Sequence, residues 1–202
     1  MYWQELDGLK VPRRIGGHPA LDFCNTWAGW DDLTNPRGEW LKTYDHLAVW
    51  AMHAELATPD DVRRTRHQAA RDPHRARAVL AASRGLRTAT HTSVLDPGDA
   101  RATAVVTGQV RRSGAAVRIQ PGPSPRWSFP RECGLDLPLL AVAWSVGDLL
   151  TRVDLDRVRT CPGHECGWLF LDASGRRRWC SMSSCGNRAK VSAFAQRHRP
   201  RR

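Results

Sequence analysis

Four cysteines near the C-terminus form two pairs with the spacing of metal ligands. Cys161 and Cys166 make one Cys-x4-Cys pair, Cys180 and Cys185 make the second, and thirteen residues separate the two pairs. A structural zinc ion takes four thiolate or imidazole ligands in a closed tetrahedron. Each pair offers two ligands from one short loop, so a small module can fold around the ion without a large core of its own. The sequence therefore predicts one structural Zn²⁺ site.

Other uses of these thiols remain open at this point. Disulfides, an iron–sulfur cluster or a redox role would also employ paired cysteines, and His164 inside the first pair could replace one thiolate. A catalytic zinc usually keeps a water position, and no conspicuous general acid or base accompanies the four cysteines. In a reducing cytoplasm clustered cysteines are typical metal ligands. Cys24 and Cys133 stand apart and are interpreted as small buried hydrophobes.

The positive charge is concentrated around the cysteines. The chain carries a formal charge of +11, and the segment 157–202 holds eleven Lys or Arg against two acids. Four thiolates and one zinc ion would remove about two of these charges. Only three of the basic residues of the chain are Lys, a bias that a GC-rich genome imposes by itself, so the clustering is the evidence rather than the choice of Arg. A module this basic is expected to bind a polyanion, most simply nucleic acid.

The residues around the second pair carry a family resemblance. Arg178-Trp179-Cys180 leads into Ser184-Cys185-Gly186-Asn187-Arg188-Ala189-Lys190, and the first pair is followed by Gly167-Trp168-Leu169-Phe170-Leu171-Asp172. Over about 40 residues this stretch resembles the CGNR zinc finger, a bacterial family named for the residues standing here at 185–188. Gly186 lies where the backbone must curl around a ligand, which favours a residue without Cβ.

A basic helix is predicted from Cys185 onward. Asn187 and Arg188 suit bidentate contacts with adenine and guanine edges, respectively. Asn187 could instead hydrogen-bond within its knuckle, the short loop that each cysteine pair forms, and a basic face is often merely solvated. The arginines near 177 and the tail 198–202 suit phosphates, whereas Trp168, Phe170 and Trp179 are interpreted as packing. The predicted DNA contacts are Arg176, Arg177, Arg178, Asn187, Arg188, Lys190, Arg197 and Arg199.

The N-terminal part of the chain reads as mostly helical. Helices are predicted over 33–57, with a turn at 35–38, and after three Pro-containing starts at Thr58-Pro59, Asp72-Pro73 and Asp96-Pro97. Alternating residues at 116–120 and 126–129 predict a β-hairpin, and 137–152 a strongly apolar core helix with Leu140, Val146 and Leu149.

The C-terminal part predicts a different architecture. Strands are expected at 157–160, 168–171 and 177–179, followed by the helix whose Val191, Phe194, Ala195 and His198 form one stripe. This order is treble-clef-like. The fold class is thus mainly α (α+β): a multihelical domain with a small β-hairpin over 1–155, and a zinc module over 156–202 that packs directly against it.

A second resemblance concerns the N-terminal part. His18-Pro19-Ala20-Leu21-Asp22-Phe23-Cys24-Asn25-Thr26 resembles the opening motif of the ABATE domain, which precedes the CGNR finger in many bacterial proteins described as stress-induced transcription regulators. Asp22, Asn25 and Thr26 could line a ligand pocket, because short polar residues beside an apolar run can orient a small molecule. They could equally cap a helix and maintain the fold, and this second interpretation is favoured.

Together these patterns predict a cytoplasmic bacterial DNA-binding transcription regulator. Duplex DNA is the expected partner, with a small-molecule effector and homodimer formation as further possibilities. The alternative is a zinc-stabilised module that binds protein or RNA without reading DNA sequence. No apolar run suggests a signal peptide or a membrane span, and no Ser-His-Asp order, phosphate loop or metal-binding His pair suggests an enzyme.

Overall fold

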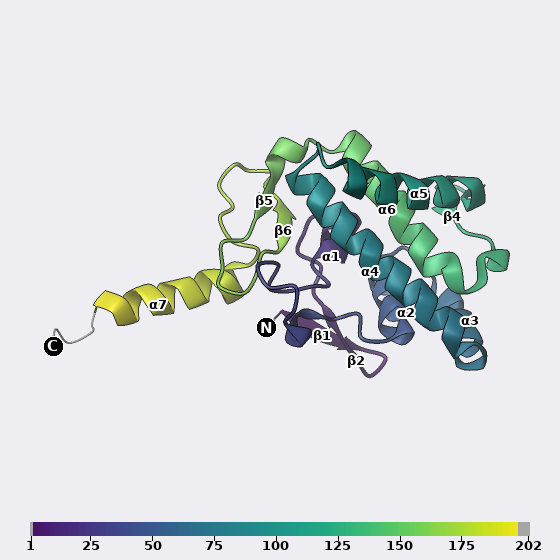
Figure 1. Cartoon of the computed structure of the whole chain (residues 1–202), viewed down its shortest axis with the longest axis horizontal. Helices are drawn as coiled ribbons and strands as arrows, with labels where there is room; N and C mark the ends of the chain where they lie inside the picture. The colour runs from purple at the N-terminus through teal and green to yellow at the C-terminus, as the bar shows by residue number, and fades with distance from the viewer. Residues whose placement is uncertain (1, 198–202) are drawn as a thin grey trace.

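The computed structural model describes residues 2–197 and contains a helical body, a small finger beside it and one helix that stands away from both (Figure 1). The finger contains the four paired cysteines and leads into the projecting helix α7 (Asn187–Arg197). The body is built from α1 (Pro19–Cys24), α2 (Tyr44–His53), α3 (Pro59–Arg71), α4 (Pro73–Leu95), α5 (Ala100–Ala116) and α6 (Leu137–Arg152).

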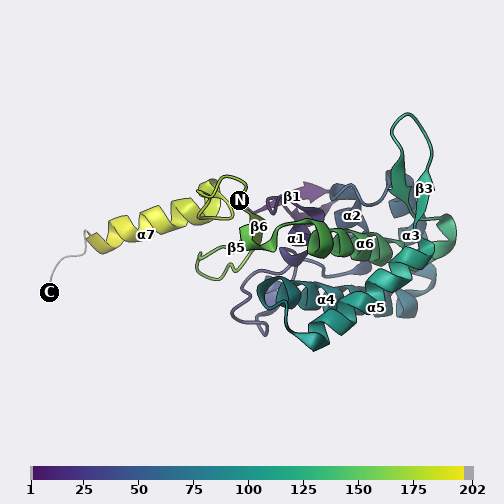
Figure 2. The same ribbon diagram turned by 90° about the horizontal axis from the view of Figure 1, so that it is seen from above.

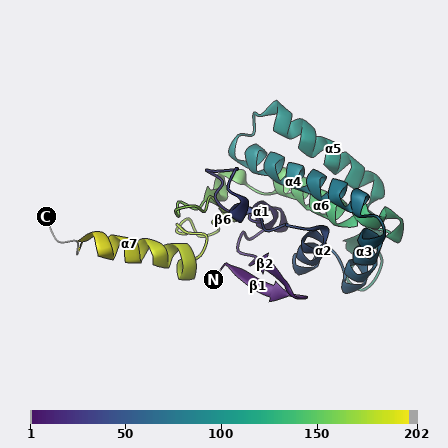
Figure 3. The same cartoon turned by 60° about the horizontal axis from the view of Figure 1, so that its bottom comes forward.

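Helix α6 lies at the centre of the body, where α4 and α5 pack beside it (Figure 3). Leu139, Val142, Val146 and Leu149 are buried on it at the spacing of one helical face. This is the predicted core helix, and its bounds agree with the prediction. The segment Arg131–Arg152 is long and apolar enough to cross a membrane, but most of it is buried inside the fold, as in the core helix of a soluble protein.

Two of the three predicted helix starts are confirmed by their caps. Thr58 and Asp61 form a reciprocal capping box at the start of α3, and Asp72 accepts a hydrogen bond from the Arg75 amide at the start of α4. The third prediction, at Asp96-Pro97, is wrong. Helix α4 runs on to Leu95, the next residues form a turn, and Asp99 caps α5 by accepting from the Ala102 amide at 2.7 Å.

The predicted helix over 33–57 is confirmed only in its second half. The turn at 35–38 becomes a short 3-10 helix, η1 (Pro36–Gly38), and the α-helical part begins at Tyr44. The residues before Tyr44, 39–43, are not helical, and a side chain of α4 binds this segment. The buried Arg87 donates two hydrogen bonds of 2.7 Å to the Glu39 carboxylate and a third to the Thr26 carbonyl. The backbone here does not continue a helix because it pairs with the segment after α1: the Trp40 amide donates to the Thr26 carbonyl at 3.0 Å, and the Gly38 carbonyl accepts from the Ala28 amide at 2.9 Å.

Three antiparallel strand pairs complete the fold. The predicted hairpin appears as β3 (Arg118–Gln120) and β4 (Arg126–Ser128) and extends from the end of the body opposite α7 (Figure 2). A further hairpin, β1 (Trp3–Leu6) with β2 (Leu9–Pro12), was not predicted. Its signal is present in the sequence, because Asp7-Gly8 joins the two strands and both residues have positive φ, as a two-residue turn of type I′ requires.

The finger begins after the short helix η3 (Leu155–Arg157). Strands β5 (Val158–Thr160) and β6 (Leu169–Leu171) pair with each other and enclose the first cysteine pair between them. The second pair leads through a π-helical turn, η4 (Met182–Gly186), into α7. The predicted strand at 177–179 is wrong. The Arg177 guanidinium donates to the carbonyls of Ile15 and Cys180, so a side chain holds this segment where a β-ladder was expected.

One side chain of the body completes the edge of the finger's hairpin. The Asn25 amide group donates to the Leu169 carbonyl at 2.8 Å, and its oxygen accepts from the Leu169 amide at 2.8 Å. Asn25 thus pairs with β6 as a neighbouring strand would. The Gly16 carbonyl extends the pairing by accepting from the Leu171 amide, and Leu169 is fully buried within the core of the body. The predicted direct packing of finger against body is confirmed.

Replacing Asn25 with Ala should therefore destabilise the whole protein. The Leu169 amide and carbonyl would lose their buried partners, and the expected loss in the free energy of unfolding is about 2 to 4 kcal/mol. Urea denaturation of the zinc-loaded protein measures it. Asn35→Ala is the matched control, since Asn35 caps only the exposed η1 turn and should cost about 1 kcal/mol. Equal losses for the two variants would contradict the assigned role of Asn25.

Candidate metal centre and nucleic-acid interface

The sulfur atoms of Cys161, Cys166, Cys180 and Cys185 converge in the finger. All four side chains are buried, and their sulfurs lie within 4.8 Å of one another. The separations are 3.7 Å between Cys166 and Cys180 and 3.6 Å between Cys180 and Cys185. A disulfide would need about 2.05 Å. A tetrahedral zinc with Zn–S bonds of about 2.3 Å requires sulfurs about 3.8 Å apart, so the donor set fits this ion.

Backbone geometry positions the sulfurs. Strand pairing continues into the first knuckle, where the Cys161 amide donates to the Trp168 carbonyl at 2.8 Å and the Cys166 amide to the Gly163 carbonyl at 3.1 Å. A Cβ on Gly163 would lie 2.6 Å from the Cys185 sulfur, so only glycine lets the two knuckles close around one point. Gly186 is less constrained, because a Cβ there would lie 2.8 Å from the sulfur of Met182, whose side chain is flexible and exposed.

Proton sharing among the thiols shifts their pKa values. Hydrogen bonding with Cys166, and next with Cys180, lowers the pKa of Cys161 to about 6. Hydrogen bonds from Cys161, Cys166 and Cys180 hold the pKa of Cys185 well below its ordinary value. Hydrogen bonding with Cys161 also raises the pKa of Cys166 and of Cys180, so two of the four ligands favour the thiolate and two favour the thiol, which loses its proton when zinc binds.

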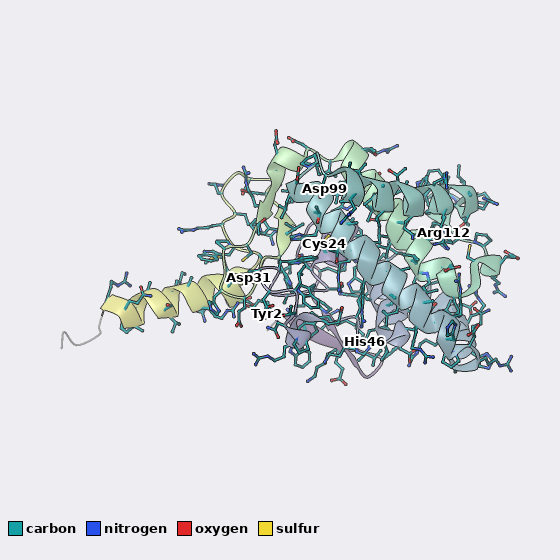
Figure 4. All side chains as sticks on the ribbon, viewed as in Figure 1. Tyr2, Cys24, Asp31, His46, Asp99 and Arg112 are labelled. Atoms are coloured by element: carbon teal, nitrogen blue, oxygen red, sulfur yellow. The ribbon has the colours of Figure 1, made fainter. Side chains whose placement is uncertain are left out.

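Tyr2 and Arg188 form the outer contacts of this centre. The Tyr2 hydroxyl lies 3.3 Å from the Cys185 sulfur, and burial raises the pKa of this phenol, which keeps it protonated and able to donate to a thiolate. The Arg188 guanidinium lies 3.4 Å from the same sulfur and 5.1 Å from the centre of the Tyr2 ring. Figure 4 shows Tyr2 near the point where α7 leaves the body. Sequence reasoning missed Tyr2, because 183 residues separate it from Cys185.

A stacked ring pair supports the first knuckle from the body. Trp30 lies against His91 of α4 with ring centres 3.6 Å apart and nearly parallel planes. A Cβ on Gly167, which follows Cys166, would come within 2.8 Å of the Trp30 Cβ, so the knuckle sits directly on this pair. Burial lowers the pKa of His91 to about 4, and the imidazole is therefore neutral at physiological pH.

The two residues predicted as possible ligand contacts are both engaged with this chain's own backbone. Asp22 accepts hydrogen bonds of 2.7 Å from the amides of Ile15 and Gly16, and burial raises the pKa of its carboxyl group. Asn25 pairs with Leu169, and the neighbouring Thr26 hydroxyl donates to the Phe23 carbonyl at 2.7 Å. These contacts connect α1 to the loop before it and to the finger.

The predicted DNA contacts fall into two groups. Arg177 and Arg188 contact the finger itself: Arg177 lies over the Phe170 ring, and Arg188 also reaches the His164 carbonyl. The others point to solvent, with Arg178 lying over the Trp179 ring. Arg199 and the rest of the tail 198–202 lie outside the described residues. The exposed members among the described residues are Arg176, Arg178, Asn187, Arg188, Lys190 and Arg197.

Helix α7 has no buried residue between Asn187 and Arg197. The predicted stripe is exposed where it is described, with Val191 61% and Phe194 58% accessible. This helix carries Arg188, Lys190 and Arg197 and no acidic residue. It therefore offers a basic cylinder with apolar side chains among the charges.

Replacing Cys161 with Ser should abolish zinc binding. Wild-type protein is expected to contain one zinc ion per chain, and the variant close to none after gel filtration, because a structural site needs all four ligands. Metal analysis by mass spectrometry measures the content. Cys133→Ser is the control, since this thiol lies outside the cluster and its loss should leave the zinc content unchanged. A Cys161→Ser protein that retains a full zinc equivalent would contradict the site.

The neutral His91 should make the protein less stable in acid. Its pKa is about 4 in the folded protein against 6.5 in an unfolded chain, so the unfolded chain binds the extra proton between these values. The contribution of the neutral His91 imidazole to the free energy of unfolding is thus complete above pH 6.5. As the pH falls to 4, about 3 kcal/mol of it is lost.

His91→Phe keeps a ring on Trp30 and removes the titration. The difference in unfolding free energy between wild type and this variant should therefore shift by about 3 kcal/mol from pH 7 to pH 4. Zinc content is measured at each pH, and the two proteins are compared over the pH range in which both keep the ion. A difference that does not change with pH would show that His91 is not buried in its neutral form.

Two family profiles match this architecture. The profile of the CGNR zinc finger matches residues 157–198, which contain the four converging cysteines, and these cysteines form the zinc site of that finger. The ABATE profile, described as "Putative stress-induced transcription regulator", matches residues 17–153. No curated protein matches the chain in sequence. Because the ABATE match spans well over half of the chain, the protein belongs to the ABATE family of transcription regulators and carries a CGNR zinc finger after that domain.

Proposed function

We propose that this regulator is a bacterial cytoplasmic protein that binds duplex DNA by placing α7 in the major groove. The observation that carries the proposal is that α7 has no buried residue and is positively charged. The major groove is about 12 Å wide and admits one α-helix of about 10 to 12 Å diameter. A helix that projects clear of the body can enter it without a clash between the body and the phosphate backbone (Figure 1).

The basic residues divide this work among them. Lys190 and Arg197 lie on α7 itself, while Arg176 and Arg178 lie on the loop before the second knuckle. Side chains on the helix can reach base edges or the flanking phosphates, and those on the loop can reach only the backbone of the duplex. We assign Asn187 to base contact at the start of α7. The tail with Arg199 would add phosphate contacts.

Arg177 and Arg188 are assigned to orienting the reading helix. Arg177 ties the segment before Cys180 to the Ile15 carbonyl, and Arg188 ties the first turn of α7 to Cys185 and Tyr2. An isolated helix of eleven residues is marginally stable in water, so an anchored first turn matters. Substitution of either arginine is expected to affect all DNA sequences alike, because neither reads a base.

The zinc-stabilised alternative, a module for RNA or protein, is less well supported. The major groove of A-form RNA is too deep and narrow for a helix, so a projecting helix favours duplex DNA. Exposed Val191 and Phe194 would suit a protein surface, but the uniform positive charge of α7 favours a polyanion. Matched titrations with duplex DNA, single-stranded DNA and RNA separate these partners.

An enzymatic role is not proposed. A hollow of about 580 Å³ lies beside Asp22 and is also lined by Arg13, Arg14, His18 and His53. The Asp22 carboxylate accepts two backbone amides there, and the His53 ring lies 3.1 to 3.2 Å from the Gln4 side-chain amide, so both groups are engaged with polar atoms of this chain. We assign both Asp22 and Asn25 to the framework of the fold.

The double variant Lys190→Ala with Arg197→Ala should weaken DNA binding and its salt dependence together. Loss of two phosphate contacts is expected to lower the slope of log Kd against log salt by about 2 and the affinity about tenfold near 0.1 M salt. Fluorescence anisotropy with a labelled duplex measures both quantities. The salt concentration is varied from about 50 to 300 mM, because counterion release makes the affinity fall over this range.

Arg111→Ala is the matched control, because Arg111 is exposed on α5 of the body. It should leave both quantities unchanged. Zinc-loaded wild-type protein without salt-dependent affinity for duplex DNA would overturn the proposal. If duplex DNA is bound, selection of bound fragments from random DNA shows whether the enriched motif is symmetric. A symmetric motif indicates binding by a homodimer.

A further inference from the structure

A hollow opens between α4, α5 and α6, and neither Asp22 nor Asn25 lines it. Its volume is about 350 Å³, and it is lined from α5 by Val106, Thr107 and Val110, from α6 by Leu150, from α4 by Ser93, and from η3 by Leu155. Sites for small molecules in proteins have volumes of about 300 to 1,000 Å³. Taking about 30 Å³ for each non-hydrogen atom, the hollow accommodates roughly ten to twelve such atoms.

The walls define the chemistry of the occupant. Valine and leucine side chains supply most of the surface, and the polar residues among those that line it carry hydroxyl groups rather than charges. A charged ligand would lose its hydration without finding a counter-charge, so an uncharged and mainly apolar molecule is favoured. Val110, together with Gly147 and Thr151, continues the hollow toward a second one beside Trp127 and Trp144, which offers aromatic surface to a longer ligand.

Ser93 supplies the second observation. Its residue is only 4% exposed, and its hydroxyl has no hydrogen-bond partner. The buried hydroxyls of Ser83 and Ser113 behave differently, since each donates to a carbonyl, of Val79 at 2.8 Å and of Leu140 at 2.7 Å. A buried hydroxyl without a partner is costly, and rotation about one side-chain bond would direct this one to a polar group in the hollow.

We propose that this hollow is a binding site for a small uncharged molecule, mainly apolar, whose one polar group hydrogen-bonds to the Ser93 hydroxyl. The site stands independently of DNA binding. Its position gives it access to the finger, because Leu155 begins η3, which runs directly into β5 and Cys161. Figure 4 shows Asp99, at the start of α5, toward the finger end of the molecule and Arg112 toward the other end.

The probe for this site is 1-naphthol, an aromatic molecule with eleven non-hydrogen atoms and one hydroxyl, which matches roughly the capacity of the hollow. Full-length zinc-loaded protein with labelled methyl groups is titrated and observed by NMR. We expect saturable binding, with the largest shifts at the methyl groups of Val106, Val110, Leu150 and Leu155. Absence of saturation at millimolar probe, or shifts confined to another part of the protein, overturns the proposal.

Variants separate a binding role of Ser93 from a structural one. Ser93→Ala should weaken probe binding about fivefold, through loss of one hydrogen bond, while leaving thermal stability equal or higher because no protein partner is lost. Ser83→Ala on the same helix is the matched control and should leave probe affinity unchanged. Thr107→Phe, which fills the hollow from α5, should reduce affinity at least tenfold. Unchanged affinity in both Ser93→Ala and Thr107→Phe refutes the site.

Discussion

The pairing between the Asn25 side chain and the Leu169 backbone is the constraint on which the rest of the structure depends. Strand β6 pairs with β5 along one edge only. On its other edge the amide and carbonyl groups of Leu169 would be buried without partners if Asn25 did not bind them. Both hydrogen bonds lie in the core, so a rearrangement that broke them while the site stayed buried would leave four polar groups unpaired. The contact of Trp30 with the first knuckle and the contact of Tyr2 with Cys185 both require the finger to be docked on the body.

Docking of this kind changes how the two matched regions are understood. In sequence they follow one another, 17–153 and 157–198. In space the segment 15–30, which contains α1, packs against the core of the finger through Ile15, Ala28 and Trp30. The Trp168 indole donates to the Trp27 carbonyl at 2.7 Å, and the Gly29 amide donates to the Cys166 carbonyl at 3.0 Å. Asn25 of the opening motif and the residues that directly follow this motif thus bind the zinc finger.

Local patterns predicted the elements well and the long-range contacts poorly. The cysteine spacing, the caps of α3 and α4, and the apolar period of α6 are encoded by neighbouring residues, and each was recovered. Tyr2 beside Cys185, Asn25 beside Leu169 and His91 under Trp30 join residues far apart in the chain, so no local period announces them. The predicted strand at 177–179 failed for the same reason, since its partner is the Ile15 carbonyl rather than a neighbouring strand. The Asp7-Gly8 turn was readable and was overlooked.

Helix α7 is anchored at its first turn through Arg188, so a small rotation there is amplified at its far end. Eleven residues extend it about 16 Å from the second knuckle. A tilt of about 10° at that fulcrum moves the far end by about 3 Å, close to the spacing of one base pair along the duplex. The contacts of Arg188 with Cys185 and Tyr2 therefore determine more than the integrity of the finger. If α7 binds DNA as proposed, these contacts also set the angle at which Arg197 meets the duplex, so a displacement too small to disturb the zinc ligands is enough to shift that contact by one step along the DNA.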